Sequence, residues 1–251
     1  MLRAAAVTRR LRRCAHTLPA ASVSPQGYES QLPPGLVAST PSPALFVFMD
    51  AVRDNVATML GHCGGDADRW RPHLKTTKMA PVYRELLVAG VTKFKCATVR
   101  EATCLLDTAA SAEAQADLLV AYPHVEPNLS RLGDLAAAHP SAKLSVLVED
   151  AEGVAAVPDS LGIFIDVNVG MDRTGQPELD EIVDAATVAS ESGQLRGLHF
   201  YDGHLTMADC AERRTQAHEC YDRAAAITRA VCAAVSSGAG SSSVEEIVCS
   251  T

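Results

Sequence analysis

Aromatic side chains are scarce in this 251-residue sequence, at 4% of residues, although 47% of residues are hydrophobic. Ala and Val dominate the apolar residues, a composition that favours buried parallel strands covered by Ala-rich helices. No uninterrupted apolar run reaches the roughly 18 residues that a membrane-spanning helix needs. The length suits one large domain with a sizeable core. The sequence therefore predicts one large α/β domain with no membrane-spanning helix.

Cysteine pairs of the form CxxC are absent, although the chain contains eight cysteines. None of these cysteines lies in a Cys/His cluster with the spacing of a zinc site. We therefore expect reduced and mostly buried thiols, and no metal ligands in this chain.

Acidic residues are absent before Glu29, and the same stretch contains five arginines. Apolar residues recur at helical spacing between these arginines, which is typical of an organellar transit peptide. Residues 1–38 are therefore predicted to be a transit peptide followed by a linker rich in Pro, Ser and Gly. The expected location is the matrix of a mitochondrion or another organelle, with the cytoplasm as the alternative.

The remainder of the chain is strongly acidic. Without the five early arginines, 17 basic and 30 acidic side chains remain, which gives a net charge of −13. A surface of this charge disfavours non-specific binding to nucleic acids and to anionic membrane surfaces. We therefore expect a small molecule, rather than a nucleic acid or a membrane, as the ligand.

Short apolar runs alternate with segments of helical periodicity after the linker. The seven predicted strands are Trp70–Leu74, Thr92–Ala97, Asp117–Ala121, Lys143–Val148, Gly162–Val169, Leu195–Phe200 and Val244–Cys249. Apolar stripes that begin at Val52, Leu129 and Ile182 predict helices between strands. Repeated strand–helix units favour a parallel sheet with helices outside. No GxGxxG motif follows the early strands, which disfavours a dinucleotide-binding sheet.

The closed form of such a sheet is the (β/α)8 TIM barrel, which typically needs about 250 residues. Only residues 39–251 follow the linker, and Thr251 comes directly after an apolar run. We therefore expect an α/β fold in which residues 39–251 form an incomplete barrel of about seven strands.

The segment RPHLKTTKM, residues 71–79, lies between the first predicted strand and a helix. Active sites of such barrels lie at the carboxyl ends of the strands. Lys75 has Arg71, His73 and Lys78 as neighbours, and crowding among cations lowers the pKa of a lysine. An uncharged amine is what a Schiff base with a carbonyl cofactor requires. The alternative is an ordinary basic surface loop.

Two later strands also end in polar motifs. In DVNVGMDRTG, residues 166–175, a glycine ends the strand and Arg173 is expected at the barrel mouth. Its guanidinium could hold an anionic oxygen there, or pair with a nearby acid. In GLHFYDGHL, residues 197–205, the side chains of His199, Tyr201 and His204 could stack on a flat ring or handle protons. The alternative is that these three residues are structural.

Together, RPHLKTTK, DVNVGMDRTG and GLHFYDGHL resemble the signatures of the D-threonine aldolase and D-serine dehydratase family. The members of this family are fold-type III pyridoxal-phosphate enzymes related to alanine racemase. The segment TPSPALFVFMDAVRDNV, residues 40–56, is also similar to the start of that family. The resemblance implies a pyridoxal-phosphate-binding barrel of the alanine racemase N-terminal type, followed in the family by a C-terminal β domain.

The resemblance implies a role for each motif. Lys75 matches the lysine that forms the Schiff base with the cofactor, and Arg173 matches the arginine on its phenolic oxygen. His199 and Tyr201 match residues near the cofactor ring, and His204 lies in the same active-site loop, where we expect a catalytic role. The family also uses a divalent metal held by the C-terminal domain, and a homodimer is implied.

The sequence departs from the family in two respects. Thr77 stands where the family commonly has His, which puts proton transfer beside the lysine in doubt. The chain stops before the Gly-rich phosphate turn, the eighth strand, the β domain and its metal ligands. We therefore expect a barrel without its C-terminal β domain, and little or no turnover from these 251 residues alone.

The resemblance predicts a lyase that acts on D-β-hydroxy amino acids. The leading hypothesis is a D-threonine aldolase-like activity, which forms glycine and acetaldehyde. D-Serine dehydration to pyruvate and ammonia is the alternative reaction. An inactive fragment or a pyridoxal-phosphate-binding remnant is the alternative outside the enzymes.

Overall fold

The computed structural model describes residues 32–236 and the backbone of residues 244–249. The chain divides into two compact units, Met1–Val47 and Phe48–Thr251. The described part of the first unit holds one short helix, α2 (Leu36–Ser39). Most of the predicted transit peptide and linker falls on residues 1–31, outside the described residues. Among the described helices, none combines the length and apolar character needed to cross a membrane.

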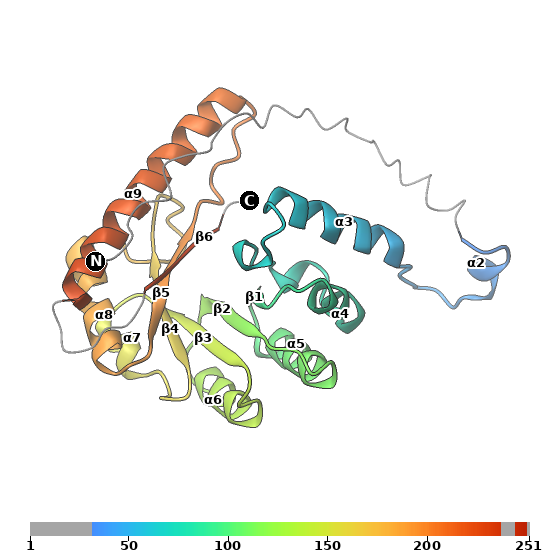
Figure 1. Ribbon diagram of the computed structural model, residues 1–251, viewed down its shortest axis with the longest axis horizontal. Coiled ribbons are helices and arrows are strands. Elements are labelled where there is room, and N and C mark those ends of the chain that lie inside the picture. The colour runs from blue at the N-terminus through green and yellow to red at the C-terminus, as the bar shows by residue number, and fades with distance from the viewer. Residues whose placement is uncertain (1–31, 237–243, 250–251) are drawn as a thin grey trace. The chain divides into compact units, whose positions relative to one another are not determined.

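A parallel sheet of six strands, paired in chain order, forms the centre of the second unit (Figure 1). The strands are β1 (Lys93–Cys96), β2 (Asp117–Pro123), β3 (Lys143–Val148), β4 (Gly162–Val167), β5 (Leu195–Tyr201) and β6 (Glu245–Cys249). Each pair of neighbours is parallel. This is the strand order of a (β/α)8 barrel, so the α/β class and the incomplete barrel are confirmed.

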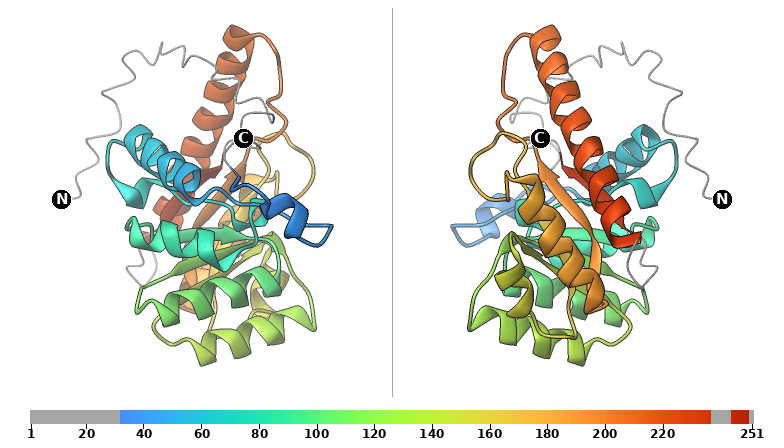
Figure 2. Two further views of the ribbon diagram at one scale, coloured as in Figure 1. Left: turned by 90° about the vertical axis from the view of Figure 1, so that its right-hand side faces the viewer. Right: turned by 90° about the vertical axis from the view of Figure 1, so that its left-hand side faces the viewer.

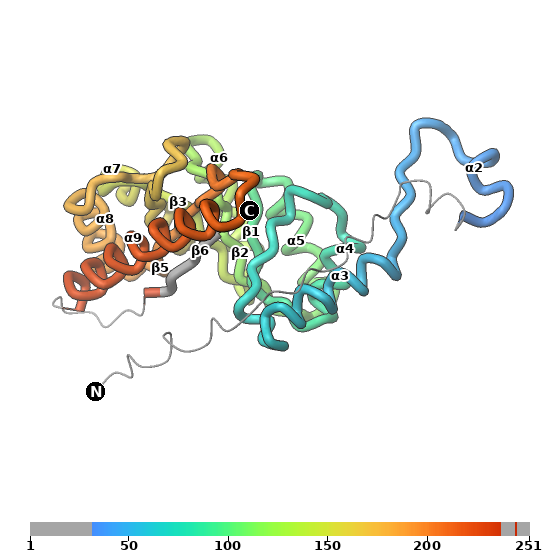
Figure 3. Tube along the Cα trace, turned by 90° about the horizontal axis from the view of Figure 1, so that it is seen from above, coloured from blue at the N-terminus to red at the C-terminus, as the bar shows by residue number. Residues whose placement is uncertain are grey.

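Helices connect successive strands from β1 onward, as a parallel sheet requires, and two further α-helices of this unit precede β1. They are α3 (Met49–His62), α4 (Ala80–Val88), α5 (Val99–Ser111), α6 (Asn128–Ala138), α7 (Ala151–Ala155), α8 (Leu179–Glu191) and α9 (Cys210–Ser236). Consecutive helices pack against one another from α4 to α6 and again from α7 to α9 (Figure 3). In both views of Figure 2, the long orange-red helix α9 extends beyond the sheet.

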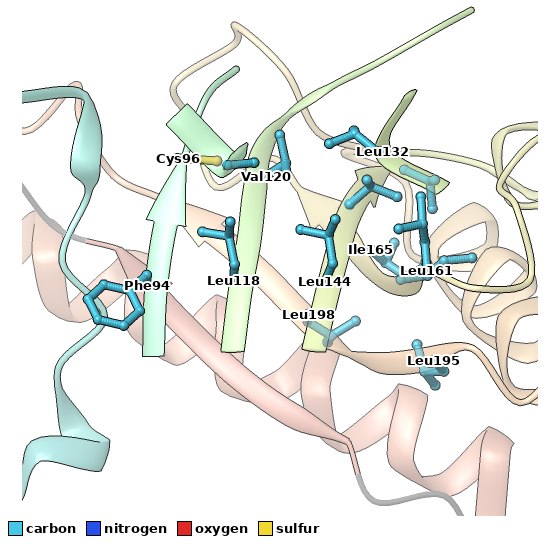
Figure 4. Packing of buried hydrophobic residues seen from close by; sticks show 14 of the residues in the cluster. Phe94, Cys96, Leu118, Val120, Leu132, Leu144, Leu161, Ile165, Leu195 and Leu198 are labelled. Atoms are coloured by element: carbon cyan, nitrogen blue, oxygen red, sulfur yellow. The ribbon is translucent and has the colours of Figure 1, made fainter. Parts of the chain in front are cut away.

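Alternation along each strand sends every second side chain to the helices. Phe94, Leu118 and Leu144 lie opposite one another in register, and all three are buried beneath the helix layer (Figure 4). The helices supply small or branched residues to the same core, including Leu132 of α6 and Ile182 of α8. The predicted helical stripes that begin at Val52, Leu129 and Ile182 therefore lie on α3, α6 and α8.

The other face of the sheet is more polar. A small apolar cluster of Leu119, Leu147 and Phe164 covers part of this inner face. The buried polar side chains at the intervening inward positions are those of Lys95, Ser145, Asp166 and His199. Buried polar groups cost free energy unless they are paired, so apolar packing alone does not explain the residues on this face.

The prediction of a strand over Trp70–Leu74 is wrong. The segment instead has extended backbone between two 3-10 helices, Ala67–Arg69 and Leu74–Thr76. Its backbone pairs with the sheet in one parallel bridge, between His73 and Lys95, where the Lys95 N–H donates to the Pro72 carbonyl at 2.9 Å. Pro72 has no N–H, so the pairing cannot continue as a regular ladder toward the start of the segment. The segment still lies beside β1, as the barrel order requires.

The buried layer between sheet and helices gives the first prediction. Leu118→Ala is expected to lower the free energy of unfolding by about 2–5 kcal/mol, because it leaves a cavity in a fully buried site. Equilibrium urea unfolding measures this loss. Val88 is 77% exposed, and Val88→Ala is expected to change the same free energy by no more than about 0.5 kcal/mol. Equal losses in the two variants would contradict the assigned core.

Candidate cofactor site

The predicted site residues gather at one edge of the sheet. All strands of a parallel sheet point their carboxyl ends the same way, and active sites of barrels use that edge. Lys75 follows the bridge at His73, Arg173 follows β4, and Tyr201 ends β5. His199 lies on β5 two residues before its end, and His204 lies just beyond it. The structure therefore places these residues at one edge of the sheet.

Lys75 is the second residue of the 3-10 helix Leu74–Thr76. The His73 side chain caps this helix, since its Nδ1 accepts a hydrogen bond from the Lys75 backbone N–H at 3.3 Å. The buried Tyr83 hydroxyl, from α4, donates to the Leu74 carbonyl at 3.3 Å. These bonds fix the backbone on both sides of Lys75, while its side chain stays exposed. The amine is therefore presented from an anchored turn.

His73 lies in a cationic environment. Burial lowers the pKa of His73 to about 3, and the charges of Lys95, Lys75 and His199 add to the effect. The imidazole is therefore neutral at neutral pH. Because Nδ1 accepts the Lys75 N–H, its proton resides on Nε2. His73 thus accepts a hydrogen bond from the Lys75 backbone and is also influenced by the charges of the buried Lys95 and His199.

Arg173 and Tyr201 come together although 28 positions separate them in the chain. The Arg173 guanidinium carbon lies 4.7 Å from the centre of the Tyr201 ring. A cation over an aromatic face at this distance is attractive by about 0.5–1 kcal/mol at an exposed site. A guanidinium carries five N–H donors, which suit an anionic oxygen of a ligand.

The loop after β4 is shaped by its own hydrogen bonds. The Asn168 side-chain oxygen accepts the N–H groups of Gly170 at 2.9 Å and Asp172 at 3.2 Å. Its amide nitrogen donates to the Asp172 carboxylate at 2.9 Å. At Gly175, where φ is +98°, an added Cβ would lie 2.7 Å from the Asn168 nitrogen, so the chain needs glycine there. The loop therefore holds Arg173 in a fixed backbone frame.

His199 is paired with a residue that the sequence did not single out, Asp166. His199 Nδ1 and Asp166 Oδ1 are 2.7 Å apart, and the two residues face each other in register on β5 and β4. Both are buried. The sequence held a signal for Asp166, because it is an acid inside the otherwise apolar strand GIFIDV.

His204 lies between the loop after β4 and helix α9. Its Nε2 is 3.9 Å from the Cys220 sulfur, and an added Cβ at Gly170 would come within 3.2 Å of the same nitrogen. Burial raises the pKa of the Cys220 thiol, which donates to the Val169 carbonyl at 3.4 Å. His204 therefore packs against backbone and a protonated thiol, on the β5 side of the edge.

Unpaired buried polar atoms mark the same edge. Within the described residues, the buried side-chain atoms without a hydrogen-bond partner are His124 Nε2, Asp166 Oδ2, Asp202 Oδ1 and His204 Nδ1. All four belong to the last residues of strands β2, β4 and β5 or to the loops that follow them. Leaving such an atom unpaired costs about 1–3 kcal/mol, so a ligand or ordered water is expected to supply partners. His124 was not predicted as a site residue.

These residues fit pyridoxal phosphate better than a metal. An exposed amine on Lys75 and a guanidinium on Arg173 suit an aldehyde and an anionic oxygen, and unpaired polar atoms lie at the same edge. In contrast, residues 32–236 contain no group of three or more His, Cys, Asp or Glu side chains arranged to hold a metal ion.

Known proteins share this architecture. A 3-hydroxy-D-aspartate aldolase of Paracoccus denitrificans (strain Pd 1222) is 26% identical over 200 residues, which cover 75% of this chain and 50% of that protein. The crystal structure of D-threonine aldolase from Filomicrobium marinum superposes with a TM-score of 0.65 at 23% identity, over 78% of this chain and 53% of that one.

D-threo-3-hydroxyaspartate dehydratase from Delftia sp. HT23 superposes with a TM-score of 0.56 at 20% identity, over 79% of this chain and 52% of that one. The chain thus spans about half the length of these relatives. The family of the alanine racemase N-terminal domain matches residues 47–247. The chain therefore belongs to this family, the fold-type III pyridoxal-phosphate enzymes.

Proposed function

We propose that this chain is a pyridoxal-phosphate-dependent lyase that acts on D-β-hydroxy amino acids, with Lys75 as the residue that binds the cofactor. The observation that supports the proposal is that the matching residues lie at the same edge of the sheet. Lys75, the Arg173–Tyr201 stack and His199 all lie at or near the carboxyl end of the same parallel sheet. Each of them matches a cofactor residue of the family that the sequence resembles.

The favoured reaction is cleavage of D-threonine to glycine and acetaldehyde. The likeness to a D-threonine aldolase and to a 3-hydroxy-D-aspartate aldolase supports a carbon–carbon bond cleavage. Dehydration of D-serine is the second candidate, and the likeness to a dehydratase of a D-hydroxy amino acid favours it. A protein that binds the cofactor without turnover is the third.

When bound, pyridoxal phosphate serves as the electron sink for chemistry at the α-carbon. The protein supplies the remaining functions. The Lys75 amine would hold the cofactor at its aldehyde carbon, and the Arg173 guanidinium would orient the ring through its phenolic oxygen. The Tyr201 ring contacts the Arg173 guanidinium, whose carbon lies 4.7 Å from the ring centre, and helps to position it. His199 and His204 are the imidazoles that move protons.

Thr77 limits proton transfer beside the lysine. It follows the 3-10 helix of Lys75, and its N–H donates to the Leu74 carbonyl at 3.3 Å. A threonine hydroxyl cannot act as a base near neutral pH, as an imidazole can. His73 does not replace it, since its pKa of about 3 makes it a weak base. The proton-handling role therefore passes to His199 and His204.

Two properties of the whole protein belong to the same proposal. The Arg-rich and acid-free first 17 residues support import into the matrix of a mitochondrion or another organelle. The family resemblance supports a homodimer.

The cofactor role of Lys75 is tested by absorption. The protein with added pyridoxal phosphate is expected to show a band at roughly 410–430 nm from the lysine-bound cofactor. Lys75→Ala should abolish this band, because no other amine is presented from that turn. Lys78→Ala is the matched control, since Lys78 is a neighbouring lysine that pairs with Glu101 at 3.5 Å. A band that persists in Lys75→Ala would remove Lys75 from its role.

The Arg173–Tyr201 contact is tested by cofactor affinity. Tyr201→Ala is expected to weaken binding of pyridoxal phosphate about two- to fivefold, because Arg173 loses the ring that supports it. Tyr201→Phe keeps the ring and should stay close to wild type. Titration of the band intensity measures both dissociation constants. Equal affinities in Tyr201→Ala and Tyr201→Phe would show that the stack does not position the arginine.

The products separate the three candidate functions. With pyridoxal phosphate and a divalent cation, D-threonine should yield glycine faster than D-serine yields pyruvate, as chromatography of the products measures. Turnover is expected to be slow, because the described residues offer no metal-binding group. Predominant pyruvate would favour the dehydratase, and a lysine-bound cofactor without either product would favour the non-catalytic protein.

A further inference from the structure

The most completely buried ionisable pair on the inner face joins Asp166 to His199. The side chains of Asp166 and His199 are 3% and 5% exposed, and their Oδ1 and Nδ1 atoms are 2.7 Å apart. They lie on neighbouring strands in direct register. The backbone of each residue is held by the sheet, so the Cα atoms of the two residues stay opposite one another.

This contact determines which nitrogen of His199 carries a proton. An ionised carboxylate only accepts hydrogen bonds, so the bond to Asp166 requires a proton on His199 Nδ1. The tautomer of an imidazole is set by the bond that its other nitrogen makes. His199 is therefore held as the Nδ1–H form when neutral, with Nε2 as the nitrogen that exchanges protons.

His73 has the opposite arrangement. Its Nδ1 accepts the Lys75 backbone N–H, so its proton is on Nε2. Besides burial, the charge of His199 is one of the causes that lower the pKa of His73. The inner face thus carries one imidazole protonated at Nε2 beside Lys75, and a second imidazole protonated at Nδ1 on β5.

We propose that Asp166 is a positioning residue, which fixes His199 as the Nδ1–H tautomer so that Nε2 can exchange a proton with the bound amino acid. The role at the substrate rests on the proposed function of this edge. The contact between Asp166 and His199 does not, because it exists in the protein without a ligand.

A purely structural role explains the pair less well. A buried ion pair can often be replaced by apolar residues of similar size with little loss of stability. In addition, the second Asp166 oxygen, Oδ2, is buried without a partner in the described part of the chain. Strand β4 thus holds a carboxylate with only one of its oxygens in use. This arrangement suits a group that controls an imidazole, since one oxygen is enough to fix the ring.

The first test uses the cofactor-free wild-type protein, labelled with ¹⁵N in its histidines. Two-dimensional NMR that correlates ring nitrogens with ring protons reports which nitrogen is protonated. The signals of His199 are identified by their loss in His199→Asn. We expect protonation at Nδ1. A neutral ring protonated only at Nε2 would overturn the proposal, and this result needs no Asp166 variant.

The second test replaces the carboxylate by an amide of the same shape. Asp166→Asn offers an N–H to Nδ1, so the neutral ring should change to the Nε2–H tautomer. In the holoenzyme, kcat for D-threonine should fall roughly 10- to 100-fold, with KM within about threefold. This loss is smaller than the roughly 100- to 10,000-fold that acid–base catalysis contributes, because His199 itself remains. Ser145→Ala, another buried polar residue of the same face, is the control and should leave the tautomer and kcat unchanged.

The outcomes are distinguishable from those that test the cofactor. An unchanged tautomer or an unchanged kcat in Asp166→Asn would overturn the role of Asp166. Loss of the lysine-bound cofactor band would instead contradict the proposed function, and the NMR result on the cofactor-free protein would be unaffected by it.

Discussion

The parallel pairing of six strands in chain order is the constraint on which the other features depend. It brings the carboxyl ends of all the strands to one edge of the sheet. Residues that are far apart in the sequence therefore lie near one another at this edge. It also divides each strand into two faces. One face packs under helices through Phe94, Leu118 and Leu144, and the other carries the buried Asp166 and His199. Stability and chemistry are thereby assigned to opposite faces of the same strands.

Electrostatics on the inner face follow from this division. On the β1 side, burial lowers the pKa of His73 and keeps it neutral, and the charges of Lys95 and Lys75 add to the effect. On the β4 and β5 side, a carboxylate holds His199 instead. The same residue type therefore has two environments within one sheet, and such a difference is how enzymes assign acid and base roles. The Arg173–Tyr201 contact adds a fixed cation at the end of β5.

Much of this architecture can be predicted from the sequence, because periodicity reports burial directly. The stripes that begin at Val52, Leu129 and Ile182 became helices, and six of seven predicted strands formed. Trp70–Leu74 failed because Pro72 removes a backbone donor, an effect that apolar pattern alone does not reveal. Asp166 was missed because its importance depends on its register with His199, which is a property of strand pairing. The roles of Lys75 and Arg173 came from family resemblance, since spacing alone left a basic loop as the alternative.

The central claim is that Lys75 is the amine that holds the cofactor. Borohydride reduction of the protein with pyridoxal phosphate converts a lysine-bound cofactor into a stable secondary amine, which peptide mass spectrometry can assign to one residue. The account predicts that the pyridoxyl group is found on Lys75. A label found on Lys78 or Lys95 instead, or no labelled lysine at all, would contradict it.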